Sequence, residues 1–207
     1  MKRVFVFLVF IMISLSINGQ FLKGNPLYVA FGMNFGNYFA SNFELNYIVR
    51  DKYVFQIAQT SSFRVAKSEP DDFTSPTIYL ILPLSFGKAY DQLESIHLMA
   101  GRVVNLKDYA RLKLMVGLGP VKIEEPINWE YLGPSRTTNY SFDYEKDYRL
   151  GLVIKPSIES HVGKVFGVSF NAIMILTNKR IMGGVGLDFV VGRLYRSNTL
   201  NEKLFKD

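Results

Sequence analysis

The stretch 110–121, Ala-Arg-Leu-Lys-Leu-Met-Val-Gly-Leu-Gly-Pro-Val, has two chemically different faces. Leucine and valine occupy one parity (112, 114, 116 and 118), whereas arginine, lysine, methionine and glycine occupy the other (111, 113, 115, 117 and 119). Alternation with a period of two residues predicts an extended strand. An aliphatic face backed by charges and glycines is typical of a small membrane barrel, which has lipid outside and a narrow polar lumen inside.

The composition agrees with one domain of this kind. The chain has 207 residues, of which 14% are aromatic and only 20% are charged, a mixture that favours transmembrane β-structure over a soluble enzyme. Cysteine is absent, which excludes a disulfide framework, a thiolate metal site and a lipid-modified N-terminal cysteine. The formal charge of +6 comes without a basic cluster, so we expect no nucleic-acid partner and instead expect contacts with anionic lipid headgroups and a charged lumen.

The N-terminus predicts export. Lys2 and Arg3 precede an apolar core at 4–15 and a small-polar segment at 16–19, which is the pattern of a secretory signal peptide. The apolar core is shorter than the roughly 20 residues of a spanning helix, although an uncleaved anchor is the alternative. We therefore expect a signal peptide at 1–19, an outer-membrane barrel at 20–195 and a polar tail at 196–207.

Alternating segments recur along the chain and predict an all-β, antiparallel, up-and-down transmembrane barrel of about eight strands. Short connections are expected at 37–41, 50–52, 105–108, 161–164 and 178–180, and the longest connection at 124–147. The segment 77–86 is ambiguous because Pro83 interrupts its apolar alternation. Since closed bacterial barrels have even strand numbers, this segment is either part of a loop or one of ten strands. The eight clear segments lie near 27–36, 43–49, 53–60, 96–104, 110–123, 148–159, 166–174 and 181–192.

The second half of the chain resembles small outer-membrane barrels of the OmpA/OmpX type. The stretches Lys-Ile-Glu-Glu-Pro-Ile-Asn-Trp (122–129), Asn-Tyr-Ser-Phe-Asp-Tyr (139–144) and Gly-Gly-Val-Gly-Leu (183–187) are most similar to a group of uncharacterised Bacteroidota outer-membrane barrels. The resemblance covers roughly residues 27–195 and implies a fold and a bacterial outer-membrane location, with no activity. One departure is that the final strand aromatic of such barrels corresponds to Tyr195, after which a polar tail continues.

No residue pattern predicts catalysis, a cofactor site or a metal site. His97 and His161 are the only histidines and lack partners at triad or metal-ligand spacing, so both are expected to be ordinary lumen or surface residues. The carboxylates at 71, 72, 124 and 125 are more typical of solvated loops than of paired catalytic acids. Glycines at 117, 119, 183, 184 and 186 lie within strand patterns and precede no helix, which argues against a phosphate loop and favours a steric role in a narrow barrel.

Charged residues on the predicted inner faces are expected to pair across the lumen, with help from Asn34, Asn46, Gln56 and Asn171. Because an eight-stranded lumen holds little more than its own side chains, we expect a filled, non-conducting core. A small pore and a ligand- or lipid-binding barrel are the alternatives, and a secreted lipocalin-like barrel would need polar side chains outside. The seven predicted inner charges are Glu44, Arg111, Lys113, Arg149, Lys155, Glu159 and Asp188.

The apolar parity that continues back to Tyr140 predicts strands that extend beyond the membrane as a protruding ribbon. A spanning strand needs only about 9–11 residues, so the surplus should stand outside. The aromatic side chains of this ribbon could bind an extracellular protein or glycan, or they could pack on one another and on lipopolysaccharide. We expect a monomer with a structural or surface-interaction role and no enzymatic activity. The candidate binding residues are Trp129, Tyr131, Tyr140, Phe142 and Tyr144.

Overall fold

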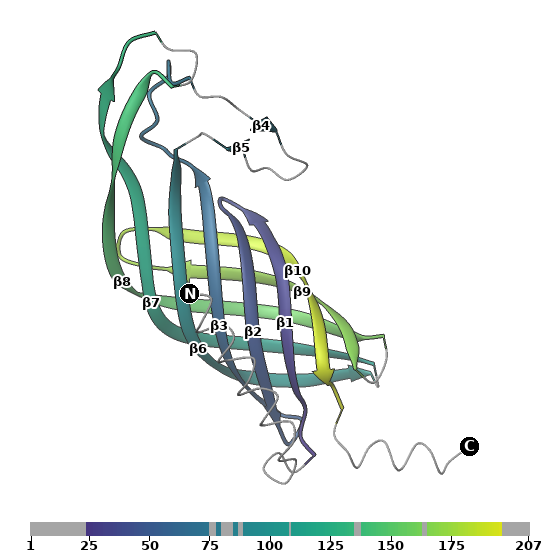
Figure 1. Cartoon of the computed structure of the whole chain (residues 1–207). Helices are drawn as coiled ribbons and strands as arrows, with labels where there is room; N and C mark the ends of the chain where they lie inside the picture. The colour runs from purple at the N-terminus through teal and green to yellow at the C-terminus, as the bar shows by residue number, and fades with distance from the viewer. Residues whose placement is uncertain are drawn as a thin grey trace, which may run out of the picture.

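Eight long strands close into a single antiparallel barrel (Figure 1), in the ring order β1-β10-β9-β8-β7-β6-β3-β2. The computed structural model describes residues 24–74, 78–79, 85–86, 89–107, 109–134, 138–162 and 165–195. The predicted signal peptide at 1–19 and polar tail at 196–207 lie outside these ranges. The barrel strands are β1 (Leu27–Gly36), β2 (Phe39–Val49), β3 (Tyr53–Val65), β6 (Tyr90–Lys107), β7 (Ala110–Tyr131), β8 (Tyr140–His161), β9 (Phe166–Leu176) and β10 (Ile181–Arg193).

Each barrel strand pairs with the next barrel strand along the chain, and the pairing of β1 with β10 closes the ring. The predicted up-and-down barrel of eight strands is therefore confirmed. Two short strands, β4 (Ile78–Tyr79) and β5 (Ser85–Phe86), pair only with each other and stand apart from the ring. The described parts of the ambiguous segment 77–86 thus belong to no barrel strand, and Pro83 lies outside the described residues.

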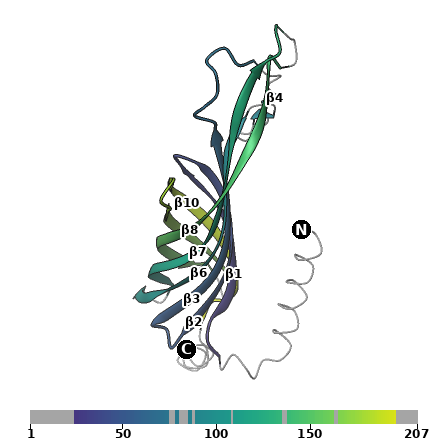
Figure 2. The ribbon, with the colours of Figure 1, turned by 90° about the vertical axis from the view of Figure 1, so that its left-hand side faces the viewer.

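The connections differ sharply between the two ends of the barrel. The start of β1 and the end of β10 lie at the end with the short turns, whereas β7 and β8 rise far beyond the other end (Figures 1 and 2). The predicted 50–52 turn is confirmed: Arg50 and Asp51 have φ angles of 53° and 56°, and the Lys52 amide donates to the Val49 carbonyl at 3.1 Å. These features define a type I′ turn, whose twist matches that of the strands.

Several predicted strand boundaries were wrong. The strand expected at 53–60 continues to Val65, and the longest connection, expected at 124–147, covers only 132–139 because β7 continues to Tyr131 and β8 begins at Tyr140. The connection expected at 37–41 contains only Asn37 and Tyr38, because β2 already begins at Phe39. The strand expected from residue 96 begins at Tyr90, where it pairs with Val65 of β3. Polar residues on the outer face, namely Ser41, Gln92 and Glu94, hide the period-two signal in these strand ends.

The barrel is apolar outside and polar inside. On β7, Leu114 and Leu118 are 59% and 53% exposed, whereas Arg111 and Lys113 are only 4% and 1% exposed. Exposed aliphatic and aromatic side chains recur on the other barrel strands, including Phe31, Phe55, Leu98 and Phe170. This is the surface of a membrane-spanning barrel and the reverse of a soluble lipocalin-like barrel. Within the described residues, no helix has the length and apolar character needed to cross a membrane.

Glycines on the inner face allow neighbouring strands to approach closely. A Cβ atom at Gly117 would overlap the carbonyl oxygen of Leu98, and one at Gly119 would overlap that of Ile96. Both carbonyls belong to the adjacent strand β6, so the crowding is between neighbouring backbones. These two glycines therefore have the expected steric role: they allow β6 and β7 to approach each other closely within the barrel wall.

Candidate functional site

The lumen near the short turns is filled by a cluster centred on Glu159. Its carboxylate accepts hydrogen bonds from the Tyr28 hydroxyl at 2.9 Å and from Arg111 Nε at 2.5 Å, and it pairs with Lys113. Lys113 Nζ also donates to the side-chain oxygen of Asn46 at 3.2 Å. Every charge in this cluster is buried, so the shared carboxylate offsets the cost of removing two cations from water.

A second lumen cluster is centred on Lys155. Its ammonium group lies between the carboxylates of Glu44 and Asp188, with 3.0 Å to Asp188 Oδ2. Asn42 donates to both carboxylates at 2.8 Å, and Asn171 donates to Asp188 at 2.8 Å. The two clusters together hold three buried cations and three buried carboxylates, so they form a charge-balanced network in this part of the lumen.

Six of the seven predicted inner charges lie in these two clusters, and the prediction for Arg149 was wrong. Arg149 has the inward parity, but β8 pairs with β9 only from Leu152 onwards, so no lumen surrounds position 149. Its side chain is 40% exposed and binds Asp147 at 2.8 Å. The parity of a strand therefore identifies an inner face only within the closed part of the barrel.

Neither histidine belongs to a catalytic or metal arrangement. His97 is buried in the lumen with Nδ1 at 3.3 Å from Ser95 Oγ, and the ring of His161 packs edge-to-face on Tyr195 at 4.8 Å. Among the described residues, no three or more His, Asp or Glu side chains are placed to hold a metal ion.

Two of the loop carboxylates make contacts that hold the structure together. Asp72 accepts a hydrogen bond from Tyr140 at 2.8 Å, and Glu125 binds Arg180 at 2.5 Å.

The strands β7 and β8 form a two-stranded ribbon beyond the closed barrel (Figure 2). Strand β8 pairs with β9 over 152–161, a stretch that matches the roughly 9–11 residues of a spanning strand. It continues to pair with β7 as far as Tyr140, where Tyr131 is its partner. Residues 140–151 of β8 thus have β7 as their strand neighbour on one side and an unpaired edge on the other side, within the described part of the chain.

A β-bulge in β7 brings the candidate aromatic residues onto one face of this ribbon. Asn128 adopts a left-handed conformation with φ of 55°, and the pairing shifts by one residue between Ile127 and Glu130. The extra residue moves Tyr131 opposite Tyr140, on the same side as Phe142. Without the bulge, Trp129 and Tyr131 would face the other side.

The five candidate aromatics contact one another in a continuous cluster. Trp129 lies 4.8 Å from Phe142 between ring centroids, Tyr131 lies 5.2 Å from Tyr140, and Phe142 lies 5.5 Å from Tyr144. Tyr131 and Tyr144 remain 55% and 38% exposed, whereas the other three are half-buried. Aromatic pairs at these distances stiffen the ribbon and leave two tyrosine faces available at its surface.

The connection between β3 and β6 docks on this cluster, a contact that the sequence did not predict. Phe73 lies 5.4 Å from Trp129, and the Tyr140 hydroxyl donates to Asp72 at 2.8 Å. Trp129 Nε1 donates to Ser68 Oγ at 3.3 Å, and Ser68 donates in turn to the Pro126 carbonyl at 2.9 Å. These contacts favour the packing role that we considered for the aromatics.

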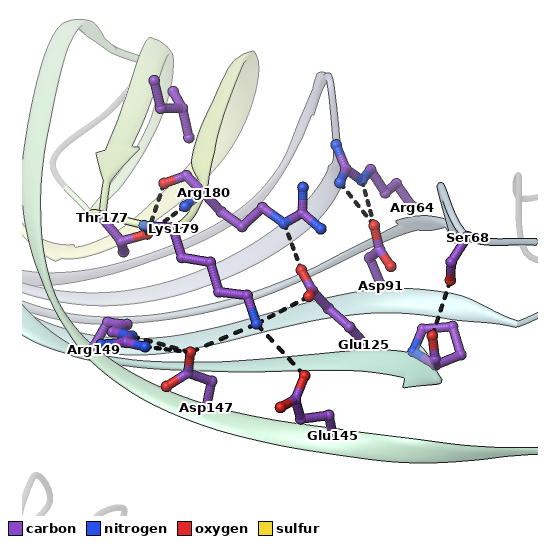
Figure 3. Close-up of polar contacts among 12 residues, drawn as sticks. Arg64, Ser68, Asp91, Glu125, Glu145, Asp147, Arg149, Thr177, Lys179 and Arg180 are labelled. Atoms are coloured by element: carbon purple, nitrogen blue, oxygen red, sulfur yellow. Dashed lines mark hydrogen bonds and ion pairs between the residues drawn. The ribbon is translucent and has the colours of Figure 1, made fainter. Parts of the chain in front are cut away.

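A charged clamp, formed by Glu125, Glu145, Asp147, Lys179 and Arg180, fastens the base of the ribbon to the β9–β10 connection (Figure 3). Lys179 Nζ lies 3.1 Å from Glu125 and 3.6 Å from Asp147. Burial acts to raise the pKa of Glu125, but hydrogen bonds from Arg180 and Lys179 outweigh it and hold the pKa below its ordinary value. The hydrogen bond from Arg149 likewise lowers the pKa of Asp147.

No protein-family model matches the chain, and no curated protein matches it. Among solved structures, the outer-membrane protein Ail of Yersinia pestis in a phospholipid nanodisc is 12% identical, with a TM-score of 0.49 over 82% of this chain and 99% of that one. Neisserial surface protein A is 14% identical, with a TM-score of 0.46 over 80% and 93%. The N-terminal β-barrel domain of Pseudomonas aeruginosa OprF is 9% identical, with a TM-score of 0.45 over 81% and 98%.

Proposed function

We propose that this protein is an integral, non-enzymatic β-barrel of a bacterial outer membrane that binds an extracellular partner through the ribbon of β7 and β8. The observation that carries this proposal is the length of β8: the ten-residue stretch 152–161 lies beside β9 in the barrel, and twelve more residues, 140–151, continue beyond it. At about 3.4 Å per residue, those twelve residues give about 40 Å of strand outside the closed ring. A structure of that length is not needed to close or anchor the barrel.

The membrane location follows from the apolar outer surface, the closed antiparallel ring and the signal-peptide pattern of the N-terminus. Closed barrels of this kind have an even number of strands in bacterial outer membranes, with short turns on the periplasmic side and longer loops outside. The ribbon then faces the cell exterior. We expect the protein to be a monomer, because a closed ring has no free barrel edge through which copies could pair.

The filled lumen supports a surface role over a pore or a lumenal ligand site. Lys155 and Glu159 each hold groups from several strands together across the interior, so a continuous water path would require both clusters to open. Opening would leave buried charges without partners, which is costly. The binding surface is therefore expected on the ribbon.

Two features of the ribbon suit a protein or glycan partner. Tyr131 and Tyr144 present exposed aromatic faces, on which a sugar ring or an apolar side chain could stack. The edge of β8 over 140–151 could add a strand of a protein partner through main-chain hydrogen bonds. Lipopolysaccharide in the outer leaflet would surround the base of the ribbon.

Crosslinking on intact cells with matched variants tests this proposal. Tyr131→Ser combined with Tyr144→Ser removes the exposed faces, and we expect crosslinks to a protein or glycan to disappear while heat-modifiable barrel is retained. Phe73→Ala serves as the comparison, because it loosens the packed side of the cluster and should weaken crosslinking only partially. Unchanged crosslinks in the double variant would refute binding through these tyrosines.

A further inference from the structure

Charges outside the lumen are unequally distributed between the two ends of the barrel. At the end with the ribbon and the long connections, eleven carboxylates accompany seven cations among the described residues. At the end with the short turns, the described side chains include four cations, those of Arg50, Lys52, Arg102 and Arg193, and a single carboxylate, that of Asp51. The described part of the periplasmic rim is therefore basic, although the two lumen clusters are charge-balanced.

Three of these cations gather around one tyrosine, in a group that we call the Tyr53 corner (Arg50, Lys52, Tyr53 and Arg102). Tyr53 and Arg102 are directly opposite in the pairing of β3 with β6, and the Arg102 guanidinium lies 4.8 Å from the Tyr53 ring centroid. The Val103 amide donates to the Lys52 carbonyl at 2.9 Å, which fixes the tight turn against β6. The corner is thus built from ordered strand ends.

The cations of the Tyr53 corner lack protein counterions. Arg50, Lys52 and Arg102 are exposed, and none forms an ion pair with another residue of the described ranges. At the opposite end, by contrast, six of the seven cations bind carboxylates. Guanidinium groups that pair with no described carboxylate and lie at one place on a surface are suited to a phosphate ligand.

The position of the corner identifies the source of that phosphate. Arg102 and Tyr53 are on the outer wall of the barrel, in line with the exposed apolar side chains Phe55 and Val104. Tyrosine and long basic side chains at the edge of an apolar band are typical of the depth at which lipid headgroups lie. A soluble anion or a peptide would have no reason to approach from the lipid-facing side.

We propose that the Tyr53 corner binds the phosphate of an acidic phospholipid in the periplasmic leaflet. The guanidinium of Arg102, oriented by Tyr53, is the central donor, and Arg50 and Lys52 add charge from the turn. Asp51 opposes binding as the sole carboxylate among the described side chains at this rim. This site is independent of any partner of the ribbon.

The test reconstitutes the full-length barrel in phosphatidylcholine nanodiscs that contain a minor fraction of phosphatidylglycerol, and counts retained lipids by native mass spectrometry. Because a basic residue near a membrane surface contributes about 1 kcal/mol, each removed cation should weaken retention about fivefold. Arg50→Gln with Arg102→Gln should therefore reduce phosphatidylglycerol retention about thirtyfold. The matched control, Lys67→Gln with Lys146→Gln, removes two exposed cations at the opposite end and should leave retention unchanged.

A third variant keeps the proposal testable if the double variant fails to fold. Asp51→Asn suits the left-handed backbone at that position and removes the opposing charge, so it should strengthen phosphatidylglycerol retention. Equal losses in the rim and control variants would indicate general charge attraction and overturn the site. Absence of phosphatidylglycerol enrichment over phosphatidylcholine in the parent protein, or displacement of the lipid by inorganic phosphate, would also overturn it.

Discussion

Replacement of Lys155 by methionine should destabilise the barrel more than removal of any exposed lysine. The Lys155 ammonium is 1% exposed and is shared by Glu44 and Asp188, so its loss leaves two adjacent buried carboxylates without their common cation. Methionine retains the length of the side chain and fills the same space, which limits the contribution of a cavity. Breaking a buried pair in this way typically costs about 3–5 kcal/mol.

Guanidinium-induced unfolding in phospholipid vesicles measures this loss, with the folded fraction read from heat-modifiable mobility on gels. The destabilisation should appear as a lower denaturation midpoint with an unchanged slope. Lys179→Met is the matched control, because that lysine also approaches three carboxylates but its side chain is 30% exposed. Partly exposed ion pairs contribute about 0–1 kcal/mol, so the control should change little.

A compensating variant separates charge from packing. Lys155→Met combined with Asp188→Asn leaves two cations and two carboxylates in the lumen, and should recover about 1–3 kcal/mol relative to the single variant. A loss below about 1 kcal/mol for Lys155→Met would refute the reasoning, since it would mean that the carboxylates are solvated by a water-filled lumen. Absence of any recovery in the double variant would assign the loss to packing.

Other properties of the barrel and ribbon can be tested separately. In planar bilayers, we expect no steady nanosiemens conductance, and such a conductance would contradict the filled lumen. Deletion of Asn128 should remove the bulge and place Trp129 directly opposite Phe142 on the same face of the ribbon, so its fluorescence emission should stay close to that of the parent; a red shift would contradict this register. Gly117→Ala should reduce the folded fraction in vesicles because the added Cβ meets the β6 backbone; a parent-like midpoint would contradict that contact. Because the folded pKa of Glu125 lies below its ordinary 4.5, its contribution is present at neutral pH and is lost as the pH falls through that folded pKa. Hydrogen-exchange protection of 140–151 should therefore fall on acidification in the parent and change less in Glu125→Gln.

The sequence predicted the barrel wherever one face of a strand is apolar and the other polar. The alternation around Leu114 was sufficient to assign the lipid face and to identify Lys113 as an inner residue. Alternation gave no signal at Ser61 and Ser62, where both faces are polar. The last residues of β3 and the first residues of β6, which pair with them, were therefore missed. Arg149 was misplaced because parity does not record where the neighbouring strand β9 ends.

The candidate site could be predicted only in part. The length of β8 follows from the apolar parity that continues back to Tyr140, and this identified the ribbon. Trp129 and Tyr131 share a face with Tyr140 only because of a bulge at Asn128, for which a single asparagine is too weak a signal. The docking of Phe73 joins segments more than fifty residues apart, and no local pattern encodes such a contact.

The central claim is that one face of each barrel strand contacts lipid while the ribbon stands in water. The chain has no cysteine, so single-cysteine variants at Leu118 and Tyr144 can carry a nitroxide spin label without background. In vesicles, collision measurements with oxygen and with a water-soluble nickel complex report the depth of each label. We predict preferential oxygen access at Leu118 and preferential nickel access at Tyr144. Equal nickel access at both positions, or a chain that remains in solution without detergent or lipid, would contradict the membrane-spanning barrel.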